Sequence, residues 1–101
     1  MITVKINGTE YPAVINGAMT DYTWDGRESK AITLEMEHAT ADGLFVDDAE
    51  WSILDGETEY DNSDYSVAGD ITDHRDGTLT IKMGKPTDLE LAYEELYGGG
   101  L

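Results

Sequence analysis

Two short segments combine aromatic side chains with charged or amide groups, and this mixture is typical of surfaces that bind other proteins. The first segment contains Tyr22, Trp24, Asp25 and Arg27, and the second contains Tyr60, Asp61, Asn62, Asp64 and Tyr65. Aromatic residues and arginine dominate the binding energy at many protein interfaces. Each segment also has a structural interpretation. Trp24 would close the end of a barrel while Arg27 pairs with a carboxylate, and the second segment would form a solvated hairpin tip.

Motifs of catalysis are incomplete in this sequence. Residues 84–87 resemble the end of a phosphate-binding Walker loop, but Leu79 stands where that loop begins with glycine, and Pro86 separates its lysine from its threonine. No Gly-x-Ser-x-Gly or comparable nucleophile motif is present. Pairs of carboxylates do not indicate a glycoside hydrolase, because any two of 22 acidic residues can lie close together. We therefore expect a non-enzymatic protein that needs no cofactor.

Metal-binding patterns are equally weak. The chain has no cysteine, and its two histidines, His38 and His74, are far apart in sequence, so a zinc site would need carboxylate ligands. Residues 61–65 fail as a calcium-binding EF-hand loop, because Ser63 and Tyr65 stand at ligand positions and the glycine is missing. No metal site is predicted. An irregular Ca²⁺ site stays open as an alternative to plain turn chemistry, and it would use Asp61, Asp64 and Asp70.

Negative charge is the strongest property of the composition. The 101 residues include 22 acidic and 6 basic side chains, for a formal net charge of -16. Residues 42–76 hold twelve of the acids and one base, Arg75. Nucleic-acid binding needs a basic surface, so we expect no direct contact with DNA or RNA. The charge suits a basic protein partner, a cation, or solubility alone.

The sequence lacks cysteine, a signal peptide and a membrane span, and these absences indicate the cellular setting. Without cysteine, no disulfide framework forms, which is natural for a cytosolic or virion protein. Residues 1–5 lack the basic region and apolar run of a signal peptide. No stretch approaches the ~18 apolar residues that a membrane span needs. We therefore expect neither secretion nor a membrane partner.

Turn signals divide the chain into short strands. Ile2, Val4 and Ile6 alternate with polar residues, and residues 7–8 are the preferred loop of a type I′ hairpin. This loop predicts the pairs Ile6–Thr9, Val4–Tyr11 and Ile2–Ala13. Pro12 lacks an N–H, which indicates that one side of the second strand is an edge.

The remaining elements follow from periodicity and turn chemistry. We predict a loop over 18–29, a strand over 30–38, a helix over 41–48 capped by Thr40, and a strand over 50–54. A polar excursion over 55–64, a strand over 65–71, a type I turn over 74–77 and a strand over 79–83 then follow. Thr87 and Glu90 fit the capping box of a C-terminal helix. Its apolar stripe, which must dock on the sheet or on a partner, comprises Leu89, Ala92, Tyr93, Leu96 and Tyr97.

These elements predict a mainly β protein of the β+α type. We expect an antiparallel β roll or partly open barrel of about six strands, with one short helix and one C-terminal helix. Residues 1–97 would form a single domain, since Gly98 ends the helix and residues 98–101 form a flexible glycine-rich tail.

Several stretches together resemble a family of small proteins encoded by prophages of anaerobic gut bacteria of the Firmicutes type. The stretches are TVKINGTEYP (3–12), WDGRESKAITL (24–34), YDNSDY (60–65), AGDITDHRDGT (68–78) and MGKPT (83–87). The family's genes lie among tail or baseplate genes of the phage. The resemblance covers most of the chain but assigns no chemistry to any residue. It implies a virion or virion-assembly protein, located in the virion or the host cytoplasm.

The sequence thus favours a phage structural or assembly protein that acts by protein–protein contact. Its expected partners are other tail components and further copies of itself, since small virion proteins often form symmetric oligomers. The alternative is an acidic anti-defence inhibitor, or DNA mimic, that binds a basic host protein. The twelve acids of residues 42–76 motivate this alternative, because they could present carboxylates at phosphate-like spacing.

Overall fold

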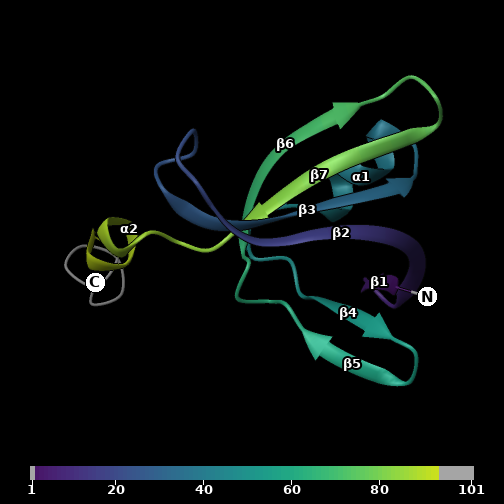
Figure 1. Cartoon of the computed structure of the whole chain (residues 1–101), viewed down its shortest axis with the longest axis horizontal. Helices are drawn as coiled ribbons and strands as arrows, with labels where there is room; N and C mark the ends of the chain where they lie inside the picture. Colours follow the sequence, from purple (N-terminus) through teal and green to yellow (C-terminus); the bar gives the residue numbers. More distant parts are fainter. Residues whose placement is uncertain (1, 94–101) are drawn as a thin grey trace.

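The predicted class is confirmed by a computed structural model, which describes residues 2–93 (Figure 1). Over these residues, seven antiparallel strands form one open sheet in the order β5-β4-β1-β2-β3-β7-β6. The strands are β1 (Ile2–Ile6), β2 (Thr9–Asp21), β3 (Arg27–Glu35), β4 (Trp51–Asp55), β5 (Thr58–Asp61), β6 (Val67–Asp73) and β7 (Thr78–Gly84). The helices are α1 (His38–Leu44) and α2 (Asp88–Tyr93). The sheet therefore has one strand more than the six or so expected.

The first hairpin forms as its turn residues require. Asn7 and Gly8 both have positive φ, at 51° and 78°, which is the signature of a type I′ turn. The turn sets the predicted register, with Ile6 opposite Thr9 and Val4 opposite Tyr11, but the third predicted pair, Ile2–Ala13, lies beyond the ladder, which ends at Thr3 opposite Pro12. The buried side chains of Val4 and Ile6 share the inner face of the sheet.

β2 is much longer than expected, and the loop predicted over 18–29 is wrong. β2 continues to Asp21 and β3 begins at Arg27, so the connection is only residues 22–26. A register shift between Asn16 and Met19 marks a β-bulge within β2. The bulge absorbs the extra residues and lets pairing with β3 resume beyond it.

The edge inferred from Pro12 is confirmed in part, because no residue of β2 pairs with a strand on both sides. It pairs with β1 over residues 9–12 and with β3 from Ala13 onward. Pro12 therefore lies at the point where β2 passes from one partner to the other. A residue without an N–H is tolerated there because the ladder with β3 starts one residue later.

The end of β3 and the start of the helix that follows it both differ from their predictions. β3 stops at Glu35 instead of 38, because its partner β7 begins at Thr78, opposite Glu35. The helix then starts at His38, not 41, with Glu37 at the N-cap and no side-chain cap. Thr40 is therefore inside the helix rather than capping it.

The second half of the sheet follows its pattern closely. The polar excursion is the β4–β5 hairpin, in which Asp55 pairs with Thr58. Gly77 closes the turn over 74–77 at φ 93°, as predicted, but the turn is not type I, because Arg75 has a φ of 61°. A second assignment is also wrong: β6 starts at Val67, so Tyr65 belongs to the connection and not to the strand. Because β5 and β6 end the strand order but are consecutive in the chain, residues 62–66 run from one end of the sheet to the other.

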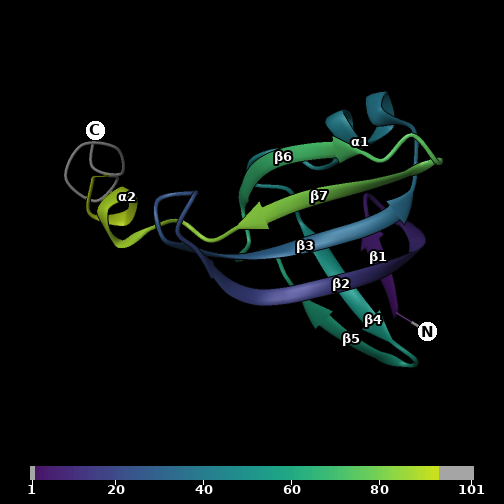
Figure 2. The ribbon, with the colours of Figure 1, turned by 45° about the horizontal axis from the view of Figure 1, so that its top comes forward.

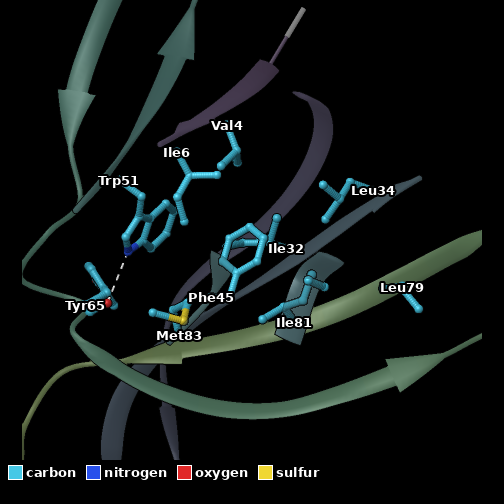
Figure 3. Close-up of a cluster of buried hydrophobic side chains, with 11 residues drawn as sticks. Val4, Ile6, Ile32, Leu34, Phe45, Trp51, Tyr65, Leu79, Ile81 and Met83 are labelled. Carbon is cyan, nitrogen blue, oxygen red and sulfur yellow. Dashed lines mark hydrogen bonds between the residues drawn. The ribbon is translucent and has the colours of Figure 1, made fainter. Parts of the chain in front are cut away.

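The core lies on the inner face of the bent sheet (Figure 3). Its members come from the predicted apolar faces of β1, β3 and β7, together with residues of α1, β4 and the connections. They are Val4, Ile6, Ile32, Leu34, Ala41, Phe45, Trp51, Tyr65, Leu79, Ile81 and Met83. Trp51 is the largest of the fully buried side chains, and its Nε1–H donates a 3.1 Å hydrogen bond to the Tyr65 carbonyl oxygen.

α2 has the predicted capping box but not the predicted docking on the sheet. The Thr87 N–H donates to Glu90 Oε1 at 2.9 Å, and the Glu90 N–H donates to Thr87 Oγ1 at 3.2 Å. Leu89 is 80% exposed and Tyr93 is 65% exposed, and none of the residues of α2 is buried. Both views place α2 at one end of the molecule, beside the loop 22–26 and away from the core (Figures 1 and 2). The predictions for Leu96, Tyr97, Gly98 and the tail fall outside the described residues.

Candidate functional site

The loop 22–26 lays Trp24 across a flat patch of the sheet. The patch is flat because two residues there, Gly69 of β6 and Gly84 of β7, have no side chain. A Cβ atom at Gly69 would lie 2.7 Å from Trp24 Cη2, and one at Gly84 would lie 2.9 Å from Trp24 Cζ3. The indole ring therefore contacts the backbone of both strands and holds the loop against them.

Arg27 fastens α2 to this loop. Its side chain is only 3% exposed, and its guanidinium carbon lies 4.7 Å from the centre of the Trp24 ring. Nη1 and Nη2 donate to the two carboxylate oxygens of Glu90, at 2.7 and 2.9 Å, and Nη1 also donates to the Lys85 carbonyl oxygen. This bidentate pair is the strongest geometry for an arginine and a carboxylate. In the structure, Trp24 and Arg27 therefore anchor the loop and the helix.

Glu90 gives the clamp a pH dependence. Hydrogen bonds from Arg27, and then from the Thr87 N–H, lower the pKa of the Glu90 carboxyl from 4.5 to about 2. A carboxyl whose pKa is lowered by folding stabilises the protein above its unfolded pKa, and this contribution is lost as the pH falls through the folded pKa.

We predict that Glu90→Gln lowers the free energy of unfolding by about 1 kcal/mol at neutral pH, because the ion pair is half exposed. The difference from the parent protein should shrink as the pH falls below 4.5 and vanish near a pH of about 2, where Glu90 itself becomes uncharged. Urea unfolding of both proteins along a pH series measures this difference. A difference that stays constant with pH would show that the carboxylate charge is not what holds the clamp.

The second segment is not the solvated tip that its composition suggests. Only Tyr60, Asp61 and Asp64 are exposed, while Asn62 and Tyr65 are buried. The Asn62 amide accepts a 2.5 Å hydrogen bond from Lys30 Nζ and donates one to the Tyr60 carbonyl oxygen. Its backbone N–H donates to the Trp51 carbonyl oxygen at 2.8 Å. Asn62 thus ties the connection 62–66 to β3 and β4.

Tyr65 sits between two lysines and one carboxylate. Lys30 Nζ and Lys85 Nζ lie 4.5 and 5.0 Å from the centre of its ring, and its hydroxyl donates a hydrogen bond to Glu28 Oε2. Burial, followed by the hydrogen bond to Glu28, raises the pKa of the Tyr65 hydroxyl above its usual value. The same bond, together with Lys85, lowers the pKa of Glu28. The hydroxyl therefore stays protonated and acts as a fixed donor.

The two segments meet at Lys85. Its carbonyl oxygen accepts a hydrogen bond from Arg27, while its ammonium group lies 3.3 Å from both Glu28 Oε2 and Asp64 Oδ2. An open depression of about 400 Å³ lies over this network, and its lining includes Lys30, Tyr60, Asn62, Tyr65 and Lys85. The charged groups along it pair mainly with one another. The contacts of Lys85 thus connect Arg27, β3 and the connection 62–66.

The acids considered for Ca²⁺ are engaged separately. Asp61 accepts hydrogen bonds from the N–H and hydroxyl of Ser63, which lower its pKa, and Asp64 pairs with Lys85. Asp70 lies on β6. Over residues 2–93, no three His, Asp or Glu side chains come together as metal ligands.

Two surfaces were anticipated only in part from the sequence. One is a group of exposed apolar side chains on α2 and the loop 22–26, here called the α2 surface, formed by Tyr22, Leu89 and Tyr93. Tyr22 was a candidate interface residue, and Leu89 and Tyr93 belong to the stripe expected to dock on the sheet or on a partner, but nothing in the sequence placed the helix beside the loop. The other is the unpaired side of β2 beyond Pro12. Pro12 indicated an edge, but its length was hidden because residues 18–29 had the composition of a loop.

Comparisons with known proteins do not indicate a function, so the proposal below is argued from the residues of this chain. Among the described helices, none is long and apolar enough to cross a membrane. No protein-family model, curated protein or solved structure matches this chain.

Proposed function

We propose that this protein is a non-enzymatic structural or assembly protein of a phage tail or baseplate, and that it acts by protein–protein contact. The resemblance to prophage-encoded tail proteins supplies the setting, in the virion or in the host cytoplasm. The observation that carries the contact is the α2 surface. Its three side chains are exposed to different extents: Tyr22 87%, Leu89 80% and Tyr93 65%.

The physical case begins with the instability of α2 on its own. The described part of α2 spans six residues, and an isolated helix needs about 12–15 residues to be even marginally stable in water. Here it keeps its shape through the capping box and the Arg27–Glu90 pair, both of which bind its polar side. Its Leu89 side chain remains 80% exposed. Polar anchoring of a helix that exposes leucine and tyrosine is the arrangement expected of a preformed binding surface.

The charge around the α2 surface indicates the kind of partner. Asp88 and Glu90 lie in the first turn of α2, no basic residue lies in its last turn, and Asp25 is exposed in the adjacent loop. A partner with an apolar groove and a basic rim would complement this surface, and opposite charges would speed association. A tail or baseplate subunit with such a groove is the proposed partner.

The test is co-purification with the tail and baseplate proteins encoded beside this gene, followed by titration calorimetry with the partner found. Leu89→Ala and Tyr22→Ala should each weaken binding by roughly 30-fold, the effect of a loss of about 2 kcal/mol at a hot spot. Val46→Ala, an exposed apolar residue outside the α2 surface, is the matched control and should bind normally. Failure to bind any tail component, or equal binding by all three variants, would contradict the proposal.

The acidic inhibitor remains a second candidate because of one observation. All twelve acidic residues between positions 42 and 76 are exposed, so their charge faces solvent. A DNA mimic should bind a basic nucleic-acid-handling protein with an affinity that falls steeply as salt rises. An interaction insensitive to salt would argue against the inhibitor, and a gene position in an early operon rather than among tail genes would favour it.

A further inference from the structure

The sheet has a third open edge besides its two end strands. β1 pairs with β2 only as far as Pro12, and the β-ladder on the other side of β2 runs with β3 through Asp21. From Ala13 to Asp21, the side of β2 that faces β1 earlier in the strand has no partner strand among the described residues. In an antiparallel strand, alternate residues point their N–H and C=O groups to each side. Part of the backbone between Val14 and Asp21 therefore lacks an interstrand partner.

The two end strands carry the protections that natural sheets use against unwanted pairing. β5 is only four residues long and includes Glu59 and Asp61, and β6 contains Asp70, Asp73 and a bulge. β6 is also partly covered, because the Ala68 N–H donates to Asp47 Oδ1 at 2.8 Å. Charge, short length, bulges and covering groups all discourage the addition of a further strand.

The open side of β2 has little of this protection. Residues 11–20 form the longest run in the sequence without an acidic or basic side chain. Val14 is 63% exposed and Met19 is 59% exposed, so apolar side chains flank the unpaired backbone. The bulge between Asn16 and Met19 divides the edge but leaves a regular stretch on each side of it. In a chain with a net charge of -16, this is the place where charge does not oppose contact.

We propose that two copies of this chain associate by pairing the open edges of β2 across a two-fold axis. The charge pattern favours a second copy of the chain as the partner at this edge. Two molecules of the same charge repel one another most where their acidic surfaces face each other, and least at an uncharged strip. Antiparallel pairing of identical strands is self-complementary, so one edge serves both partners. Backbone hydrogen bonds would supply affinity, and Val14 and Met19 would add apolar contact.

The salt dependence of this dimer should differ from that of binding to a basic partner. The rest of each copy is strongly acidic, so the two bodies repel one another at low ionic strength. Added salt screens this repulsion and should tighten the dimer. Binding to a basic partner through the acidic surface would weaken under the same change.

The test uses the full chain in sedimentation equilibrium at about 0.05 M and about 0.5 M NaCl. We expect a reversible dimer that is tighter at the higher salt concentration. The V14K/M19K double variant places four lysines at the shared edge and should raise the dissociation constant about tenfold or more. Val46→Lys, which adds a lysine at an exposed apolar position outside this edge, should leave the dimer intact.

Hydrogen–deuterium exchange locates the contact. Amides between Val14 and Asp21 should become protected as the protein concentration rises, while those of β5 should not change. A monomer under every condition, or a dimer that V14K/M19K leaves unchanged, would overturn the proposal. The inference is independent of the α2 surface, so Leu89→Ala should leave the dimer unchanged, and protection confined to α2 would reject the β2 edge. Both lysine variants should retain the parent melting temperature, because the replaced side chains are exposed.

Discussion

Trp51→Ala is expected to lower the free energy of unfolding by about 3–5 kcal/mol, the usual loss for a buried tryptophan in a packed core. The side chain is 2% exposed, and its ring meets that of Tyr65 edge-on with centroids 6.4 Å apart (Figure 3). The substitution leaves a cavity beneath β1 and removes the donor to the Tyr65 carbonyl oxygen. Because small domains have only about 5–15 kcal/mol in total, the variant should be close to unfolding at ambient temperature.

Trp51→Phe separates the two contributions of this residue. Phenylalanine keeps most of the aromatic packing but cannot donate the hydrogen bond, and a buried carbonyl left without its partner costs about 1–3 kcal/mol. Urea unfolding followed by far-ultraviolet circular dichroism measures both variants. We expect alanine to be clearly the worse of the two. A loss below about 1 kcal/mol for Trp51→Ala would mean that the connection 62–66 does not depend on this contact.

The elements that the sequence predicts correctly are those whose bonds are local. The type I′ turn at residues 7–8 and the capping box at Thr87 each join residues three positions apart. Residue type and spacing are enough to specify such bonds. The alternating faces of β1 and β7 are also local patterns, and their inward residues form much of the core.

The elements that it predicts wrongly depend on a distant partner. β3 ends at Glu35 because β7 begins opposite that residue, and nothing near Glu35 in the sequence reports where β7 begins. Residues 18–21 were expected to begin a loop, yet they continue β2 past a bulge because β3 offers a strand to pair with. Propensity gives way to tertiary context in both places.

The candidate site shows the same division. The residue types singled out in the two segments were informative, since Arg27 does pair with a carboxylate. The identity of that partner was not predictable, because Glu90 lies 63 positions away. Likewise, Tyr65 was expected in a strand but lies in the connection that brings it to Glu28, 37 positions away. The apolar stripe with Leu89 and Tyr93 is visible in the sequence, but whether it docks on the sheet or stays exposed depends on contacts that a single sequence does not report.

Gly84→Ala is expected to lower the free energy of unfolding by about 1–3 kcal/mol through overpacking. The added methyl group would lie 2.7 Å from Arg27 Cδ and 2.9 Å from Trp24 Cζ3. Both side chains are constrained, Arg27 by its bidentate bonds to Glu90 and Trp24 by its contact with the arginine. To admit the methyl group, the ring must lift from β7, which loosens the clamp on α2.

A double-mutant cycle with Trp24→Ala tests this mechanism. If the ring is a main obstacle, Gly84→Ala should cost much less in the Trp24→Ala background than in the parent protein. Gly43→Ala is the matched control, because a Cβ atom there meets nothing within 4 Å and the residue lies in α1. That substitution should stabilise the protein by about 0.5–1 kcal/mol through better helix propensity. Equal effects of Gly84→Ala in both backgrounds would place the strain on Arg27 alone, and a stabilising Gly84→Ala would refute the close approach of Trp24 to β7.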